Sequence, residues 1–571
     1  MVNKIKQKNW KYKDRGDTFT IELLKKSINV SDIIAGLLVQ KNIDTYDKAK
    51  IFLRPSKEYL NDPFLMKNMV IAIETINEII KSNKKILIYG DYDVDGITSV
   101  ALVYDFFNKI IPSKVLFYIP DRYDEGYGLS FKGIDYAKNN DCDLIIALDC
   151  GIRANEKVDY ANSLFIDIII CDHHLPGSIL PNAKAILDPK QSDCIYPFKE
   201  LSGCGIGFKL IEAFSKKYLP SNIDDIFNYV DLVAISIASD IVPIVDENRI
   251  LAFLGLKLLN EKPRTSIQAI SRVSKLNKKI NISDIVFMIG PRINAAGRVD
   301  HGKKAVNLLI TQNIEIADEI ANEINEDNTK RKGLDREISE EAIEIVNNDI
   351  KFFNKKSIIV YSDNWHKGVI GIVASRLVEK FYKPTIVLTK VDGVYTGSAR
   401  SIEGFNINSA LEKCSKYLEK FGGHEFAAGM TIKKENIELF ADEFEKIAQE
   451  IITSDMLLPK IEIDLEINFC DINKKMLSVI SQFEPFGPDN MSPVFSSNNV
   501  IAKENAKIVG ENHIKLTLTQ NGISFNAIAF NQGEFLEKIK NKVPFSVCYN
   551  IEENIWLNKS EIQLNIKDFK I

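Results

Sequence analysis

Short apolar runs alternate with amphipathic segments between about residues 66 and 250. Four of these runs are typical of buried strands, namely ILIY (86–89), VLFYI (115–119), LIIAL (144–148) and IDIII (166–170). Continuous apolar strands separated by helical segments indicate a parallel sheet that is covered on both faces. We therefore predict an α/β domain over residues 66–255.

Helical patterns dominate on either side of this domain. Residues 1–65 contain short helical patterns without evident chemistry, and residues 256–350 are mostly helical. Two sets of apolar residues follow helical spacing, first Ala317, Ile320, Ala321 and Ile324, then Leu334, Ile338 and Ile345. The stretch between these sets is highly charged, which suits a long helix that bridges two domains.

Two further domains are predicted after the long helix. A second α/β pattern begins at KSIIVYSD (356–363) and ends in an amphipathic helix, which gives a domain over residues 351–457. From residue 458 to 571 short segments alternate apolar and polar residues, with turn signals between them. This pattern predicts a small antiparallel barrel of about five strands that is compatible with an OB-fold.

Composition limits the class of protein. The chain has 571 residues, 45% of them hydrophobic, and a net charge of −5. A nucleic-acid partner would therefore need a local basic groove. The eight cysteines form no CxxC pair, and the sequence has neither a signal-peptide pattern nor an apolar run of membrane-spanning length. We expect a cytoplasmic protein with reduced thiols and no membrane association.

Carboxylates and histidines follow the apolar runs. Asp91, Asp93 and Asp95 lie in YGDYDVDG after the first run, Asp149 follows the third, and Asp172, His173 and His174 follow the fourth. Asp240 closes another apolar segment, ISIASDIVPI. Because ligands of doubly wound sheets bind beyond the carboxyl ends of the strands, we expect these groups to converge on one edge.

Clustered carboxylates are costly unless cations neutralise them. Several aspartates with one or two histidines suit Mn²⁺ or Mg²⁺ better than a structural zinc ion. Two ions about 3.5–4 Å apart would support phosphoester hydrolysis. Any single segment alone is more simply explained as a helix cap or a solvated loop, but the agreement of four segments favours a metal site.

Two stretches are candidates for binding phosphate. Residues 261–279 contain six basic residues and one acidic residue, although such runs are more often solvated faces. PRINAAGR (291–298) places arginines among small residues that permit close approach to a ligand. Tyr123 and Tyr127 could stack on a base or simply pack their loop, and the barrel could bind a single strand or serve only for packing.

These residues resemble the DHH phosphoesterase superfamily, whose namesake triplet is Asp172-His173-His174 here. WHKGVIGIVASRL (365–377), TGSARSIEGFNI (396–407) and FGGHEFAAGM (421–430) are similar to elements of its associated C-terminal domain, the DHHA1 type. IPDRYDEGYG (119–128), GPRINAAGR (290–298) and the strand-rich C-terminal domain narrow the resemblance to the long, single-strand-specific exonucleases of the superfamily.

The resemblance implies roles for individual residues. The implied metal ligands are Asp93, Asp95, Asp149, His173 and Asp240, with Asp91 as a further ligand or a close neighbour of the ligands. Asp149 would bridge two ions, and His174 would stabilise the transition state at the phosphate. Substrate phosphates near the metals would be held by Arg122, Arg292, Asn294 and Arg298. Ser398 and Arg400 would bind a terminal 5′ phosphate, with Gly423 and His424 nearby.

The resemblance also implies an activity, whereas the residues alone imply only metal-assisted phosphoester hydrolysis. The implied enzyme degrades single-stranded DNA from the 5′ end, releases 5′-mononucleotides and serves DNA repair and recombination. Its implied partners are single-stranded DNA, a single-strand-binding protein and a helicase, and we expect a monomer. The alternatives are a DHH phosphodiesterase that acts on cyclic dinucleotides, short RNA or polyphosphate, and an inactive binding protein.

One element departs from the pattern of these long exonucleases. FEPFGPDNMSPVF (483–495) replaces a glycine-richer element and places Pro488 and Asp489 in a turn. This departure leaves the implied metal site intact but affects the expected contact between the last domain and the rest of the chain.

Overall fold

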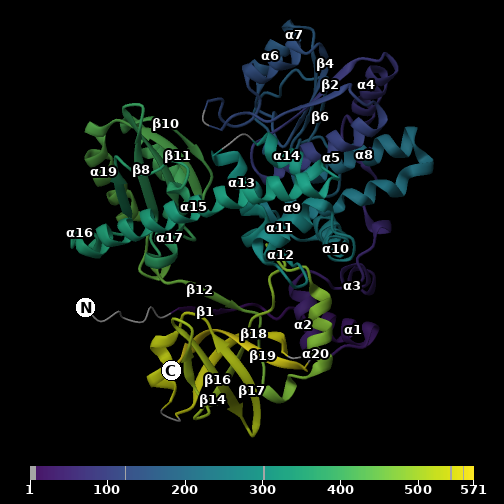
Figure 1. Ribbon diagram of the computed structural model, residues 1–571. Helices are drawn as coiled ribbons and strands as arrows, with labels where there is room; N and C mark the ends of the chain where they lie inside the picture. The colour runs from purple at the N-terminus through teal and green to yellow at the C-terminus, as the bar shows by residue number, and fades with distance from the viewer. Residues whose placement is uncertain (1–7, 123, 300–301, 541–542, 557–558) are drawn as a thin grey trace.

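The computed structural model describes residues 8–571 except 123, 300–301, 541–542 and 557–558, and it describes no side chains for 296–299, 555–556 and 559. The chain forms two α/β lobes joined by a long helix, with a β-barrel below them (Figure 1). This arrangement confirms the predicted fold class.

The first lobe contains a five-stranded parallel sheet in the order β3-β2-β4-β5-β6. Its strands are β2 (Lys85–Gly90), β3 (Val115–Tyr118), β4 (Cys142–Leu148), β5 (Asp167–Cys171) and β6 (Ala185–Leu187). Alternate side chains of each strand enter two separate hydrophobic cores, Ile86 and Ile88 on one face and Leu87 and Tyr89 on the other. The apolar runs are continuous because both faces are buried.

Helices cover both faces of this sheet. One core includes residues of α4 (Met69–Lys81), α5 (Val94–Ile110) and α8 (Gly203–Tyr218), and the other includes residues of α6 (Phe131–Asn139) and α7 (Asn155–Ser163). The segment that contains ISIASDIVPI forms a helix, α9 (Val230–Ser239), not a strand, and Asp240 caps its C-terminus. The helical region continues with α10 (Asp246–Glu261), α11 (Thr265–Ser274), α12 (Ile282–Asp284), a π-helical turn (Ile285–Ile289), α13 (Gly290–Val299) and α14 (Lys303–Ile310).

The bridge between the lobes is α15 (Ile314–Asn348), a helix of 35 residues. Its first half contributes Ala317, Ala321 and Ile324 to the core of the first lobe. Its second half contributes Ile338 and Ala342 to the core of the second lobe. The helix is therefore long because its two ends are buried in different cores, as its two separate apolar faces predict.

The second lobe contains a mixed sheet in the order β10-β11-β9-β8-β7, in which only β7 and β8 are parallel. Its elements are α16 (Lys351–Asn354), β7 (Ile358–Ser362), α17 (Ile370–Phe381), β8 (Thr385–Val391), β9 (Val394–Arg400), α18 (Ile407–Lys413), β10 (Leu418–Gly423), β11 (Ala427–Ile432) and α19 (Ile437–Ile451).

The C-terminal domain is a closed five-stranded barrel. The strands run in the order β14-β18-β19-β17-β16, and a pairing between β16 and β14 closes the ring. Their bounds are β14 (Phe495–Ala502), β16 (His513–Gln520), β17 (Ile523–Ala529), β18 (Phe545–Trp556) and β19 (Lys559–Lys570), with β12 (Lys460–Ile463), β13 (Leu465–Glu466), α20 (Lys474–Ile480), β15 (Lys507–Val509) and α21 (Leu536–Ile539) as additions.

The N-terminal segment packs on this barrel, although the two lie at opposite ends of the sequence. Strand β1 (Asn9–Tyr12) pairs in parallel with β12. Helices α1 (Thr18–Ile28), α2 (Asp32–Gln40) and α3 (Tyr46–Leu53) contribute residues such as Leu24 and Leu38 to the core of the barrel domain. The sequence pattern does not predict this contact.

The unusual turn at residues 483–490 joins the barrel to the first lobe. The backbone N–H of Ile244 donates to the carbonyl of Pro488 at 2.8 Å. The guanidinium of Arg249 donates to the carbonyls of Gln482 and Glu484 at 3.0 and 2.9 Å. The segment that we expected to affect the contact between the last domain and the rest of the chain therefore lies directly at that contact.

Among the residues that the structure describes, none of the helices combines the length and the apolar character that a membrane span requires.

Candidate metal centre

The acidic residues that follow the strands lie at one edge of the parallel sheet. The last residues of β2, β4 and β5 are in register, since Gly90 pairs with Leu148 and Leu148 pairs with Cys171. The next residue along each strand is an aspartate, respectively Asp91, Asp149 and Asp172. Parallel strands in register end at the same level, so the three carboxylates converge as the sequence predicts.

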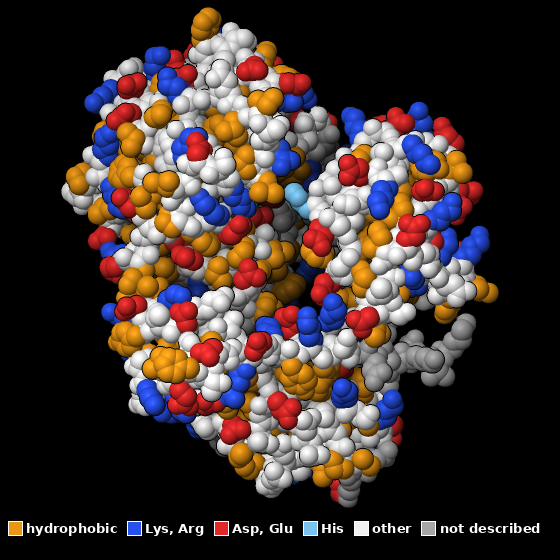
Figure 2. All heavy atoms as spheres, turned by 180° about the vertical axis from the view of Figure 1, so that it is seen from behind, with side chains coloured by type: hydrophobic (Ala, Val, Ile, Leu, Met, Phe, Trp, Pro, Cys, Tyr) orange, Lys and Arg blue, Asp and Glu red, His pale blue; other side chains and the backbone are white. Residues whose placement is uncertain are grey.

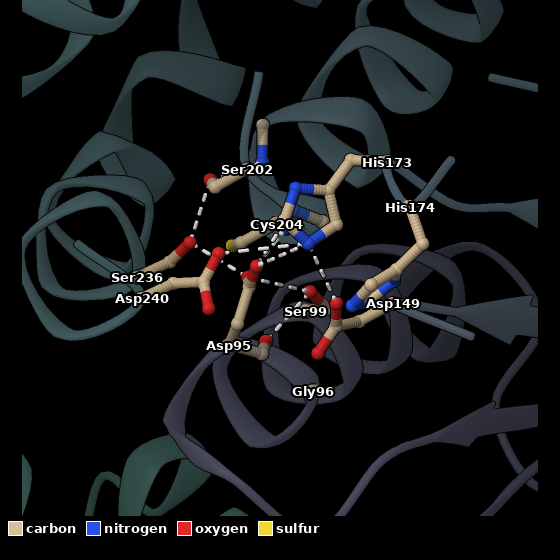
Figure 3. Close-up of polar contacts among 12 residues, drawn as sticks. Asp95, Gly96, Ser99, Asp149, His173, His174, Ser202, Cys204, Ser236 and Asp240 are labelled. Atoms are coloured by element: carbon tan, nitrogen blue, oxygen red, sulfur yellow. Dashed lines mark hydrogen bonds and ion pairs between the residues drawn. The ribbon is translucent and has the colours of Figure 1, made fainter. Parts of the chain in front are cut away.

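His173 stands at the centre of a carboxylate cage (Figure 3). Its Nε2 lies 3.2 Å from Asp149 Oδ1, 3.5 Å from Asp240 Oδ2 and 3.8 Å from Asp95 Oδ2. Only 6% of the residue is exposed. Within the described part of the chain, neither ring nitrogen has a hydrogen-bond partner of acceptable geometry. A buried nitrogen without a partner is costly, and a cation that accepts its lone pair would remove that cost.

Asp95 is oriented by donors from other helices. Its carboxylate accepts hydrogen bonds from the backbone N–H groups of Gly203 and Cys204 at 2.7 and 2.8 Å, and from Ser236 Oγ at 2.7 Å. The two N–H groups belong to the first turn of α8, where unpaired N–H groups and the helix dipole favour an anion. Sequence reasoning missed these residues, because only the fold brings α8 and α9 to the end of β2.

Gly203 also permits the close approach of α8 to the site. A Cβ added at this position would lie 2.7 Å from the Cβ of Asp149 and 2.9 Å from its Oδ1. Any larger side chain would displace the Asp149 carboxylate. The signal in the sequence is the SGCG run at 202–205, in which Ser202 caps the helix by accepting from Gly205 N–H at 3.2 Å.

Asp91 and Asp93 complete the acidic group. Asp91 is fully buried and accepts from Gly128 N–H at 3.1 Å through one oxygen, while its other oxygen has no partner among the described residues. Asp93 caps α5 and accepts from Gly96 N–H at 3.1 Å. These bonds fix both carboxylates at the beginning of the helix.

The carboxylates are crowded enough to disfavour full ionisation. Burial, followed by the charge of neighbouring aspartates, raises the pKa of Asp91, Asp93 and Asp149. The same causes raise the pKa of Asp240 to about 8. Divalent cations bound among these carboxylates would offset the mutual repulsion of their charges. The residues therefore fit Mn²⁺ or Mg²⁺, since they offer oxygen ligands and one imidazole.

His174 lies at the edge of the cage, with its ring centroid 4.6 Å from that of His173 and one ring nitrogen within 4.8 Å of an Asp149 oxygen, and it is held by Asp172. Its Nδ1 lies 2.7 Å from Asp172 Oδ1, and that carboxylate also accepts the backbone N–H groups of Ile152, His173 and His174. Burial alone would lower the pKa of His174, but the hydrogen bond and the charge of Asp172 outweigh it and raise the pKa. The hydroxyl of Tyr127 donates to the Asp149 carbonyl at 2.9 Å and lies 3.3 Å from each ring nitrogen of His174.

The expected phosphate-binding residues of the first lobe lie on two elements. Arg122 lies over the ring of Tyr92, 4.8 Å from its centroid. The charge of Arg122 lowers the pKa of Asp91, but burial and the charge of Asp93 raise that pKa by more. Arg292, on α13, is mostly buried and donates to the Met288 carbonyl at 2.6 Å and to Asn325 Oδ1 at 3.1 Å. Asn294 is half-buried on the same helix, and the side chain of Arg298 lies outside the described residues.

Ser398 and Arg400 form a separate group in the second lobe. Arg400 Nη1 donates to Ser398 Oγ at 3.0 Å. A Cβ added at Gly371 would lie 3.1 Å from both Arg400 Nη2 and Ser398 Oγ, so the two side chains stand at the N-terminal turn of α17. Burial lowers the pKa of Arg400, and no carboxylate among the described residues pairs with it. A cation, a hydroxyl and a helix N-terminus together suit a phosphate.

Gly423 and His424 lie on the hairpin beside this group. Gly423 ends β10 with a φ of +156°, and a Cβ there would collide with the carbonyl of Ala427. His424 is exposed, and its N–H donates to the same carbonyl at 2.8 Å. Sequence reasoning did not single out Gly371, although it recognised the surrounding stretch.

A deep hollow separates the two lobes when the molecule is viewed from behind, with a histidine side chain at its rim (Figure 2). The metal centre lies in the first lobe and the Ser398–Arg400 group lies on β9 of the second lobe, so the two belong to different lobes.

Models of three domain families match the chain. The N-terminal domain of the DHH family matches residues 85–237, the DHHA1 domain matches residues 354–450, and the RecJ OB domain matches residues 463–568. The metal centre lies almost entirely in the first of these ranges, with Asp240 just beyond it.

Whole-chain comparisons agree with the domain matches. The single-stranded-DNA-specific exonuclease RecJ of Bacillus subtilis (strain 168) is 37% identical over 558 residues, which cover 97% of this chain and 70% of the relative. The RecJ of Escherichia coli (strain K12) is 31% identical over 519 residues, which cover 87% of this chain and 89% of the relative.

A solved structure shares the fold across almost the whole chain. The crystal structure of RecJ in complex with Mn²⁺ from Thermus thermophilus aligns with a TM-score of 0.84 and 22% identity, covering 99% of this chain and 79% of that chain. Sequence identity to these relatives supports the same family as the order of the three domains and the shared fold. The chain therefore belongs to the RecJ family of DHH proteins.

Proposed function

We propose that this chain is a metal-dependent exonuclease that degrades single-stranded DNA from the 5′ end and releases 5′-mononucleotides. The observation that carries the proposal is the imidazole of His173, which lies within 3.8 Å of three carboxylates and lacks a hydrogen-bond partner among the described residues. The relatives named as single-stranded-DNA-specific exonucleases support the substrate.

The residues that would hold two Mn²⁺ or Mg²⁺ ions are Asp91, Asp93, Asp95, Asp149, His173 and Asp240. When bound, the ions would activate water and neutralise charge on the phosphate. Asp149 is the bridge that the resemblance implies, and its carboxylate is the one closest to Nε2 of His173. The structures of RecJ from Thermus thermophilus with Mn²⁺ and with Mg²⁺ support this choice of ions.

His174 is proposed to act at the phosphate as an imidazolium. Asp172 holds its Nδ1 at 2.7 Å, which leaves Nε2 to donate a hydrogen bond to a phosphate oxygen as charge develops. Arg122, Arg292, Asn294 and Arg298 would hold the neighbouring phosphates of the strand. Arg292 is buried, and its described hydrogen-bond partners are neutral oxygens. A buried guanidinium without a described carboxylate partner favours the binding of an anion, which supports this role.

The direction of digestion is proposed to come from the second lobe. The Ser398–Arg400 group and the N-terminal turn of α17 would bind the terminal 5′ phosphate, and Gly423 and His424 lie beside this group. Because this group and the metal centre lie on different lobes, a strand anchored by its 5′ end would span the hollow between them. Contacts from both lobes to the phosphate backbone of one DNA strand would favour a single strand over a duplex.

The cellular setting follows only from the resemblance to the family. We propose a monomer that acts in the cytoplasm in DNA repair and recombination, with a single-strand-binding protein and a helicase as partners. These proposals carry no residue assignments.

One assay tests the proposed activity. Single-stranded oligonucleotides labelled at the 5′ or the 3′ end are digested with Mn²⁺ or with excess EDTA, and a cyclic dinucleotide serves as the alternative substrate. We expect Mn²⁺-dependent release of the 5′ label as a mononucleotide, no activity in EDTA, and no turnover of the cyclic dinucleotide. Digestion in EDTA, or a clear preference for the cyclic dinucleotide, would contradict the proposal.

A further inference from the structure

Ile241 has a backbone conformation that β-branched residues rarely adopt. It directly follows Asp240, and its φ angle is +60°. In this left-handed region a branched Cβ crowds the backbone, so glycine or asparagine is the usual choice after a helix. The chain therefore carries steric strain one residue away from a proposed metal ligand.

The interior of the protein does not require an isoleucine at this position. The residue is 65% exposed, so it adds little to the core. The backbone beyond it is anchored independently, because Val242 and Ile244 are buried and the Ile244 N–H bonds to Pro488 O at 2.8 Å. An asparagine would accept the same φ with less strain and would expose no apolar group.

Ile241 directly follows a residue of the metal centre. The carboxylate of Asp240 lies 3.5 Å from His173 Nε2, and Figure 3 shows it directed toward that ring. On the other side, Ser239 contacts the helix that carries Arg292, since a Cβ added at Gly290 would lie 2.9 Å from Ser239 Oγ. An exposed apolar residue thus directly follows a residue of a site composed mainly of charged residues.

We propose that Ile241 contacts the face of an unpaired nucleobase adjacent to the phosphate at the metal centre, and so acts as a substrate-positioning residue. This inference rests on the proposed function. A phosphate at the centre brings its covalently attached nucleoside to the rim of the site. In a single strand the face of that base is free for a sequence-tolerant apolar contact, whereas in a duplex neighbouring bases cover it.

The first test separates this role from a structural one. Ile241→Asn should leave the melting temperature of the protein in EDTA unchanged or raise it by about 1–3 °C, because strain is relieved. Mn²⁺ affinity, measured by isothermal titration, should not change. The KM for a dT oligonucleotide should rise about fivefold, with a smaller effect on kcat.

A matched control is Ile350→Asn, which removes a similarly exposed isoleucine, at 78% exposure, from an ordinary φ of −54° beyond the long helix. It should change neither Mn²⁺ affinity nor the KM. If Ile241→Asn weakens Mn²⁺ binding, the side chain acts through Asp240 and the proposal is overturned.

The second test uses the substrate. Oligonucleotides that carry a single abasic site at the first, second or third nucleotide are compared for the wild type and Ile241→Asn. At one position the abasic site should raise the KM of the wild type about fivefold and have no further effect on the variant. Additive losses at all three positions would overturn the proposal. If the wild type does not cleave single-stranded DNA at all, the proposed function itself fails.

Discussion

The carboxylate of Asp172 lies 2.7 Å from Nδ1 of His174, so the first and last residues of the DHH triplet form a charged hydrogen bond. Between them, His173 turns into the carboxylate cage. The triplet thus supplies two imidazoles in different environments: within the described structure, that of His173 has no hydrogen-bond partner, whereas that of His174 is paired with a carboxylate.

Loss of the Asp172 charge should change the pH dependence of the enzyme. Burial lowers the pKa of His174 but Asp172 raises it by more, so the imidazolium persists to higher pH and is lost as pH rises through that pKa. In Asp172→Asn we expect kcat to fall by about 10²-fold or more and the alkaline limb of the kcat profile to move to lower pH. Asp167→Asn, which neutralises a half-exposed aspartate at the start of β5, serves as the control. An unmoved alkaline limb would remove His174 from the proposed role.

Neutralising Asp149 should have opposite effects on the free and the metal-bound protein. Carboxylates with raised pKa values bind more protons in the folded than in the unfolded state, so the metal-free protein should lose stability as pH rises toward the pKa of about 8 of Asp240. Asp149→Asn should reduce this loss.

The same variant should lose the stabilisation by Mn²⁺, which for the wild type amounts to about 2.7 kcal/mol at a hundredfold excess over Kd. Melting curves from pH 5 to 9, with and without Mn²⁺, provide the measurement. A variant that Mn²⁺ still stabilises, or that still cleaves DNA, would exclude Asp149 as a ligand.

A single methyl group on α8 should disturb the centre without altering any ligand. Gly203→Ala places a Cβ 2.7 Å from that of Asp149, so we expect Mn²⁺ affinity to fall by about 10–100-fold. Gly205→Ala lies on the same helix, where the nearest atom would be 3.4 Å away, and should stay close to the wild type. Equal effects of the two substitutions would point to destabilised helix packing as the cause.

Arg400 should matter most for substrates with a 5′ phosphate. Removing a charge-assisted contact costs about 1.5–3 kcal/mol, so Arg400→Ala should raise the KM for 5′-phosphorylated strands roughly 10–100-fold and that for 5′-hydroxyl strands much less. Lys390→Ala, on the neighbouring strand β8, is the control because that lysine pairs with Asp363. A similar loss on both kinds of substrate would argue against recognition of the terminal phosphate.

Binding of single-stranded DNA should weaken with added salt despite the net charge of −5. Each phosphate that the protein neutralises releases counterions, so log K should fall linearly with log salt, with a slope of about −0.7 per contact. Fluorescence anisotropy of a labelled strand between 50 and 300 mM salt measures the slope. A flat response would contradict a strand held by its phosphates.

The parallel sheet and most of its acidic edge follow from local sequence. Runs such as ILIY and LIIAL are continuous because both faces of each strand are buried, and an aspartate directly after the end of the strand lies at the carboxyl edge. Asp91, Asp149 and Asp172 therefore come together wherever the strands pair in register. Asp240 was found by the same reasoning, although it ends a helix, because a segment buried on all sides shows neither strand nor helix periodicity.

Tertiary structure decided what the local pattern could not encode. The donors to Asp95 come from Gly203, Cys204 and Ser236, more than a hundred residues along the chain, and the N-terminal helices share a core with the barrel at the other end of the sequence. Hydrophobic periodicity reports which side of an element is buried but not which surface covers it. The sequence alone thus indicated the proposed ligands, and the packing of distant helices determined the orientation of their side chains.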